Sequence, residues 1–124
     1  MGTPDADAID PTAFANLLEM TGGDIEFVDE LVDTYLGDGV SQLATMRDAA
    51  AGGDLDALTR AAHSLKSGSM NVGAIRLGEL CRSLEEAGRS GTVDEPARLV
   101  AVIAAAFDDA ATALVAERAV RAPG

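Results

Sequence analysis

The sequence predicts an all-α fold, an antiparallel up-and-down four-helix bundle with a short N-terminal capping helix. Apolar residues recur at steps of three and four along most of the 124 residues, which is the spacing of one helix face. Aspartates and glycine pairs interrupt this pattern where helix N-caps and helix ends are expected. Aromatic residues make up only 3% of the chain, whereas alanine and leucine are abundant, and small and branched aliphatic side chains fill helical interiors well.

Aspartates begin the first two predicted helices. Asp10 can cap free backbone amides, and Pro11 suits the first helical turn, where its missing N–H costs nothing. This short helix should end near Met20. Asp24 follows a glycine pair and begins a second, longer helix.

Two glycines, Gly37 and Gly39, fall inside the second helix. Each is expected to cost about 1 kcal/mol relative to alanine in a helix interior. The apolar series nevertheless resumes in phase with Val40 and Leu43, so we expect one continuous helix to Ala51.

A third helix follows Gly52, Gly53 and Asp54, which end one helix and cap the next. Its apolar positions alternate steps of three and four, as in the seam of a bundle helix. Asn71 and Gly73 mark its end. The apolar positions are Leu55, Leu58, Ala62, Leu65, Ser69 and Val72.

Another buried stripe predicts a fourth helix that ends near Gly88. Thr92 with Glu95 resembles a capping box, and Pro96 is tolerable only if the last helix begins about there. That helix should run to about Ala119. The stripe of the fourth helix consists of Ile75, Leu77, Leu80, Cys81 and Leu84.

The connections between these helices are short, which forces neighbouring helices to run antiparallel. A helical chain of this length can bury roughly two thirds of its unfolded surface in one core. We therefore expect one domain over residues 10–120, flanked by a flexible N-terminus at residues 1–9 and a flexible C-terminus at residues 121–124.

Charge and cysteine content exclude several classes of protein. The formal net charge is −12, with 21 acidic against 9 basic residues, so the surface should repel nucleic acid and anionic lipid. One cysteine, Cys81, excludes an intramolecular disulfide, and with one histidine in the chain we expect no metal site. The longest uncharged apolar stretch, Leu99 to Phe107, is far shorter than the roughly 20 residues of a membrane span, and residues 1–10 lack the features of a signal peptide. We expect a cytoplasmic monomer that does not associate with membranes.

The one histidine, His63, should face solvent. At about 100° per residue, it lies roughly 130° from the mean direction of the apolar stripe of the third helix. Thr59 and Ser67 lie one turn before and after it, and Arg60 and Lys66 lie three residues to either side. Small hydroxyl side chains leave the imidazole accessible, and the two cations lie within reach of any group attached to it.

This arrangement suits a carrier of phosphoryl groups. A neutral imidazole is a nucleophile near neutral pH and can accept a phosphoryl group from an acyl phosphate without a metal of its own. The transferred group carries negative charge, which a nearby ammonium stabilises. Lys66 is the candidate, because its stem can lie along the bundle while its head reaches the phosphate. Geometry alone, however, favours the ordinary interpretation of His63 as a solvated surface histidine.

The segment Ala62 to Ala74, AHSLKSGSMNVGA, resembles the signature of the histidine phosphotransfer family, commonly written A-H-x-L-K-G-x-x-x-x-x-G-A. His63 matches the phosphorylated histidine, Leu65 the buried leucine and Lys66 the lysine that faces the phosphate. Gly73 matches the glycine that ends the helix.

The resemblance extends over nearly the whole chain, because residues 17–36 resemble the family's entry into its long helix and residues 77–89 the helix after the histidine. It implies an antiparallel four-helix bundle and a phosphocarrier protein that is not itself an enzyme and needs no cofactor of its own. The implied partners are the receiver domains of a hybrid sensor histidine kinase and of a response regulator. Those receivers would supply the aspartates and a Mg²⁺ ion.

The chain departs from the signature at two positions. Ser67 stands where the family has a glycine, with Gly68 displaced by one, and the small residue of the family leaves space for the phosphoryl group and the docking receiver. Serine should preserve this access, and its hydroxyl can hydrogen-bond to phosphate or imidazole. Met70 replaces a small residue and would widen an apolar docking patch. The expected partner-binding residues are Thr59, Arg60, Ser67, Gly68 and Met70.

A different class of function also fits this face. A non-catalytic helical adaptor could bind a receiver or another signalling protein there without carrying phosphate, although it would need neither the histidine nor the lysine. Cys81 is interpreted as a small buried hydrophobe, and Glu85 with Glu86 as a solvated helix face. The sequence has no glycine-rich nucleotide loop, so we do not expect the chain to phosphorylate itself from ATP.

Overall fold

The computed structural model describes residues 8–121, and its regular structure is entirely helical in that range, which confirms the all-α prediction. The first two predicted helices and the continuity of the second through both glycines agree with the structure. The helices are α1 (Pro11–Met20), α2 (Ile25–Gly52), α3 (Leu55–Asn71), α4 (Ile75–Arg89) and α5 (Pro96–Arg121).

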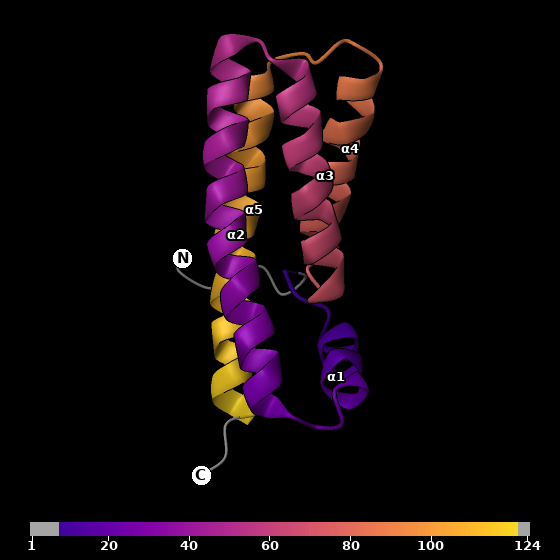
Figure 1. Cartoon of the computed structure of the whole chain (residues 1–124), viewed down its shortest axis with the longest axis vertical. Helices are drawn as coiled ribbons and strands as arrows, with labels where there is room; N and C mark the ends of the chain where they lie inside the picture. Colours follow the sequence, from indigo (N-terminus) through magenta and orange to yellow (C-terminus); the bar gives the residue numbers. More distant parts are fainter. Residues whose placement is uncertain (1–7, 122–124) are drawn as a thin grey trace.

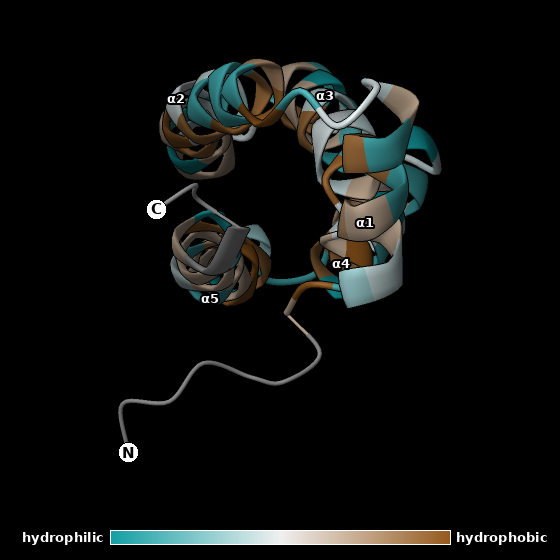
Figure 2. Cartoon of the chain, turned by 90° about the horizontal axis from the view of Figure 1, so that it is seen from below, coloured by the Kyte–Doolittle hydropathy of each residue, from teal (hydrophilic) through white to brown (hydrophobic). Residues whose placement is uncertain are grey.

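Helices α2 to α5 pack together as the bundle, and α1 lies at one end of it (Figure 1). The chain ascends α2, descends α3, ascends α4 and descends α5, so that successive helices run antiparallel. Each of α3 and α5 packs against both α2 and α4. Viewed along the bundle, α1 crosses below the ends of α3 and α4 (Figure 2).

The predicted aspartate caps form at three helix starts. In each case a side-chain oxygen accepts a hydrogen bond from a backbone N–H of the first turn, which would otherwise lack a partner. The donor and acceptor pairs are Thr12 and Asp10 (2.9 Å), Phe27 and Asp24 (3.1 Å), and Ala57 and Asp54 (3.1 Å).

The predicted capping box before the last helix is wrong. It would place Glu95 inside the first turn, but α5 begins at Pro96, and Glu95 precedes it with a φ of 48°. Its carbonyl oxygen accepts hydrogen bonds from the backbone N–H groups of Arg98 and Leu99. Proline restricts the residue before it and lacks an N–H, so it is tolerated at the first helical position but not further inside.

The packed part of the chain begins before residue 10. Ala8 and Ile9 are buried, although they fall in the segment predicted to be flexible. The backbone N–H of Asp10 then donates to the carbonyl of Gly73 at the turn between α3 and α4, over 2.8 Å. This bond fixes the entry of α1 beneath the bundle. Residues 1–7 and 122–124 of the predicted flexible ends lie outside the described residues.

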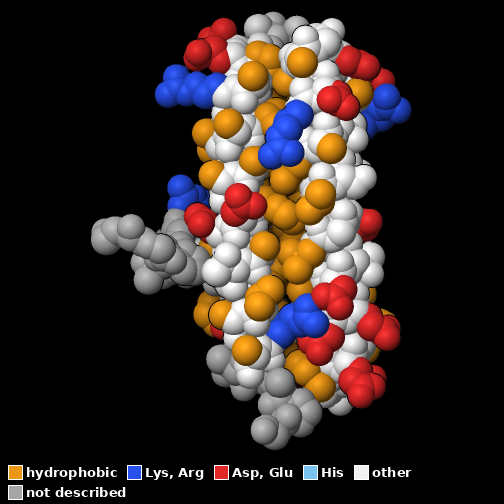
Figure 3. Space-filling model, turned by 90° about the vertical axis from the view of Figure 1, so that its left-hand side faces the viewer, with side chains coloured by type: hydrophobic (Ala, Val, Ile, Leu, Met, Phe, Trp, Pro, Cys, Tyr) orange, Lys and Arg blue, Asp and Glu red, His pale blue; other side chains and the backbone are white. Residues whose placement is uncertain are grey.

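The last helix, α5, is long and apolar enough to cross a membrane by length and composition alone. In the structure it is the fourth helix of the bundle and contributes Val100, Ile103, Phe107 and Leu114 to the core. Core helices of soluble bundles share this length and composition. Figure 3 shows hydrophobic side chains along the seam between α2 and α5.

A glycine permits the close approach of these two helices. A Cβ atom added to Gly39 would overlap the ring of Phe107, which lies in the core and stacks at an angle against Tyr35, with ring centroids 5.9 Å apart. A Cβ atom added to Gly37 would meet no atom within 4 Å. The two helical glycines therefore have different roles, and only Gly39 is required by packing.

We predict that Gly39→Ala destabilises the fold by about 1–3 kcal/mol, because the methyl group displaces the Phe107 ring from a filled core. The matched variant Gly37→Ala should instead be neutral or stabilise the fold by up to about 1 kcal/mol through helix propensity. Urea unfolding followed by circular dichroism measures both values. Equal effects of the two substitutions would show that the packing against Phe107 is unimportant.

Candidate functional site

His63 lies in the middle of α3 and faces outward, as predicted. Its side chain is 54% exposed. Ala62, directly before His63, and Leu65, two positions after it, are buried in the core. They anchor the helix while the imidazole stays accessible. Solvent exposure of this kind is what a reaction with a second protein requires.

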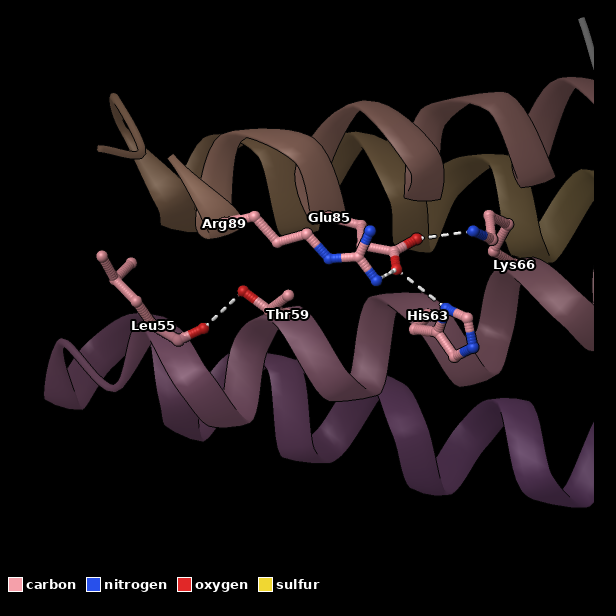
Figure 4. A network of polar contacts seen from close by, with 6 residues as sticks. All are labelled: Leu55, Thr59, His63, Lys66, Glu85 and Arg89. Carbon is pink, nitrogen blue, oxygen red and sulfur yellow. Dashed lines mark hydrogen bonds and ion pairs between the residues drawn. The ribbon is translucent and has the colours of Figure 1, made fainter. Parts of the chain in front are cut away.

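A carboxylate from the next helix holds the imidazole (Figure 4). The Nδ1 atom of His63 lies 2.8 Å from Oε2 of Glu85 in α4. The other carboxylate oxygen, Oε1, accepts a hydrogen bond of 2.6 Å from Nζ of Lys66. Arg89, one turn further along α4, places Nη2 2.6 Å from Oε2. One carboxylate therefore binds three basic side chains from two helices.

The interpretation of Glu85 as a solvated residue is wrong, because its side chain is only 1% exposed. It follows Cys81 by four residues and Leu84 by one, and both are buried in α4. The sequence did contain this signal, since a residue four positions after a buried one lies on the same helix face. Glu86, the second residue of the pair, is exposed.

The environment of Glu85 keeps its carboxyl ionised. The hydrogen bond from Lys66 lowers the pKa of Glu85 most, and burial opposes this effect by raising the pKa. The hydrogen bond from His63 and the charge of Arg89 lower the pKa further, so that the net shift is downward. A buried charge is stable only when it is paired and hydrogen-bonded, and Glu85 meets this condition.

An ionised carboxylate also determines which nitrogen of His63 carries the proton. It can only accept hydrogen bonds, so the nitrogen that faces it, Nδ1, must be the donor. In the neutral ring, Nε2 then keeps a free lone pair on the opposite side from Glu85. The exposed nitrogen is ready to act as a nucleophile without first losing a proton.

Lys66 and Arg60 have different surroundings. Lys66 is 24% exposed, and its ammonium lies against Glu85, close to the imidazole. Arg60 is well exposed and pairs with Asp56 on its own helix, with 3.2 Å between Nη2 and Oδ2. Lys66 thus belongs to the cluster around His63, whereas Arg60 lies on the open surface beside it.

Two predicted partner-binding residues lie at the contact between α3 and α4. A Cβ atom on Gly88 of α4 would overlap the Thr59 hydroxyl, which donates to the carbonyl of Leu55 over 2.6 Å. A Cβ atom on Gly78 would lie 2.7 Å from Cε of Met70. Both side chains thus fill space that glycines leave between the helices.

The other two, Ser67 and Gly68, lie nearer to open surface. Ser67 is exposed, one turn after His63. Gly68 faces the opposite flank of α3, where a Cβ atom would lie 3.0 Å from the Tyr35 ring. It lines a hollow of about 320 Å³ between α1, α2 and α3. Other residues around the hollow are Leu17, Leu31, Asp38, Ser64 and Asn71.

Two further titratable side chains, Tyr35 and Cys81, are buried in the hydrophobic core. Tyr35 and Ser69 join their hydroxyls over 2.8 Å, and burial raises the pKa of Tyr35 to about 12. Burial likewise raises the pKa of Cys81 to about 12, so its thiol stays protonated and unreactive at neutral pH. Among the described residues, no cluster of histidine, cysteine or acidic side chains could hold a metal ion.

A family model for the Hpt domain matches residues 30–117, a range that includes all four members of the cluster around Glu85. The chain is similar to the crystal structure of histidine-containing phosphotransfer protein B (HptB) from Pseudomonas aeruginosa PAO1, with a TM-score of 0.84 and 31% sequence identity. That similarity covers 92% of this chain and 96% of the other. No curated protein matches the chain.

We predict that Glu85 stabilises the fold at neutral pH and that this contribution disappears in acid. Because the pKa of Glu85 is lower in the folded chain than in the unfolded chain, its contribution is complete above the ordinary carboxyl pKa and is lost as the pH falls through the folded value. Urea unfolding should therefore show a difference between wild type and Glu85→Gln at pH 7 that shrinks toward pH 3. A difference that does not depend on pH would contradict the charged role of Glu85.

Proposed function

We propose that this chain, which belongs to the Hpt domain family, is a phosphorelay intermediate that accepts a phosphoryl group on His63 from an aspartate of one receiver domain and passes it to an aspartate of a response regulator. A single observation carries the proposal. The imidazole is about half exposed, and the buried carboxylate of Glu85 binds its Nδ1 atom, which leaves Nε2 turned away from Glu85 (Figure 4). A surface histidine without function would need no such partner.

The transfer step follows from this proton arrangement. The lone pair of Nε2 attacks phosphorus, the bond between phosphorus and the aspartyl oxygen breaks, and the electron pair leaves with the aspartate carboxylate. No proton has to leave Nε2, because the ring carries its proton on Nδ1. The phosphorylated ring gains positive charge, which the adjacent Glu85 carboxylate stabilises. The reverse sequence returns the group to a second aspartate.

Lys66 supplies positive charge to the phosphoryl group. An ammonium has three N–H donors, and the hydrogen bond to Glu85 uses one of them. The others can reach oxygens of a group on His63, where negative charge develops during transfer. Glu85 therefore holds both the nucleophile and the cation, one on each carboxylate oxygen.

We infer a phosphocarrier and not an enzyme. The chain supplies the nucleophile and fixed charges, while the partner receiver supplies its aspartate and a Mg²⁺ ion. This division agrees with a site that faces outward, because the second half of the reaction centre arrives with the partner. The chain itself needs no cofactor under this proposal.

The docking face would comprise the outward side of α3 and the adjoining hollow. Arg60 and Ser67 neighbour His63 on α3, and Gly68 lines the hollow, whose apolar lining comes from α1 and α2. Thr59 and Met70 would act at the edge, through the contact with α4. Such encounters bury little surface and are transient. We place the reaction in the cytoplasm, with a monomeric carrier, no nucleic acid and no membrane.

The proposal predicts that a phosphorylated receiver labels His63. Receiver domains of the source organism, charged with radioactive acetyl phosphate, should transfer label to the wild-type chain, and the label should be stable in alkali and labile in acid. His63→Gln should accept none, because its side chain has no nucleophilic nitrogen.

Circular dichroism of His63→Gln controls for loss of fold. Absence of label with every receiver, together with stable binding of a receiver in a pull-down, would instead support a non-catalytic adaptor.

A second prediction concerns Lys66. Lys66→Ala should slow transfer on the order of tenfold or more, because the transferring group loses a charged hydrogen-bond donor. Arg98→Ala removes a well-exposed cation from the first turn of α5 and serves as the matched control, with an unchanged rate expected. Rapid-quench kinetics with one receiver measures both variants. If Lys66→Ala transfers at the wild-type rate, the proposed role of the ammonium is refuted.

A further inference from the structure

Ser67 lies where a group attached to His63 would extend. The two residues are four positions apart on α3, so their side chains are neighbours on the helix surface, and both are exposed. Helical side chains lean toward the N-terminus of the helix. The Ser67 side chain therefore leans toward His63 and not away from it.

The orientation of the imidazole brings its reactive nitrogen to the same side. Glu85 binds Nδ1, and Figure 4 shows Nε2 on the far side of the ring, turned away from Glu85. Ser67 follows His63 by one helical turn on the same exposed face of α3. A phosphoryl group on Nε2 would therefore lie on the face that carries the Ser67 hydroxyl.

The Ser67 hydroxyl is free to bind such a group. Three threonine hydroxyls of the chain donate to the backbone carbonyl four residues earlier, and Ser67 does not follow them. Within residues 8–121, its hydroxyl makes no hydrogen bond at all. The three threonines are Thr45, Thr59 and Thr112.

We propose that the Ser67 hydroxyl donates a hydrogen bond to a phosphoryl oxygen on His63 and thereby stabilises the phosphorylated state of this chain. The inference rests on the proposed function for its biological meaning. Glycine, which the resembling signature has at this position, offers neither the hydroxyl nor the Cβ atom. Ser67 would then contact the phosphoryl group and add a neutral hydrogen-bond donor to the ammonium of Lys66.

The chemistry of the phosphorylated state gives a direct measurement. A hydrogen bond donated to a phosphoryl oxygen favours the more highly charged form of the group, so it lowers the pKa of the phosphoryl. The test charges the purified chain with phosphoramidate, a small phosphoryl donor: Nε2 attacks phosphorus, the P–N bond of the donor breaks, and ammonia leaves. Phosphorus NMR then follows the phosphoryl signal as a function of pH.

Ser67→Ala and Ser67→Gly should each raise the pH midpoint of the phosphoryl signal by about half a unit or more relative to wild type, because both lack the hydroxyl. The control variant is Ser83→Ala, which removes an exposed serine two positions before Glu85, on the opposite side of α4. It should leave the midpoint unchanged. Circular dichroism establishes that every variant is folded.

A wild-type midpoint in Ser67→Ala overturns the inference, and so does a shift confined to Ser67→Gly, which would reflect the backbone or the Cβ atom. A wild-type chain that phosphoramidate does not label at His63 also overturns it. Because no receiver domain takes part in this experiment, its results do not depend on whether the chain works in a phosphorelay. If His63 is phosphorylated by phosphoramidate but exchanges its phosphoryl group with no receiver, the proposed function is refuted and the role of Ser67 stands.

Discussion

The site depends on one buried carboxylate. Glu85 binds His63, Lys66 and Arg89 at distances of 2.6–2.8 Å while its own side chain is almost wholly inaccessible. Burial of a carboxylate carries a large desolvation cost unless cations surround it. Removal of one cation would leave the buried charge incompletely compensated. The arrangement therefore links the geometry of the reactive ring to the packing of α3 against α4.

That packing depends on small residues. Gly78 and Gly88 of α4 leave room for Met70 and Thr59 of α3, which brings the two helices close enough for Glu85 to reach across. A larger residue at Gly88 would overlap the Thr59 side chain, and one at Gly78 would require Met70 to move. The chemistry of the exposed face is thus set by contacts that are themselves buried.

Charge is distributed unevenly over this acidic protein. Near His63, the basic side chains of Lys66 and Arg89 both bind the carboxylate of Glu85. The surroundings of His63 therefore contain cations although the chain has a net charge of −12. At the other end of the bundle, Arg118 of α5 pairs with Asp29 and Asp33 of α2, at 3.0 and 2.6 Å. These pairs join the last helix to the longest one. Opposite charges therefore surround the exposed histidine at one place and join two helices at the other.

The sequence by itself determined what depends on neighbours along the chain. Aspartate caps, glycine pairs and the period of apolar residues predicted the helices, and the angle of His63 from its own apolar stripe predicted its exposure. The same local signals failed at Glu95, where the restriction imposed by Pro96 outweighed a capping pattern. Only the tertiary structure decided that Glu85 is the partner of His63, because the rotation and separation of α3 and α4 depend on which side chains interlock between them. A helix period gives the direction of each side chain around its own axis, but it contains no information on what a second helix places opposite.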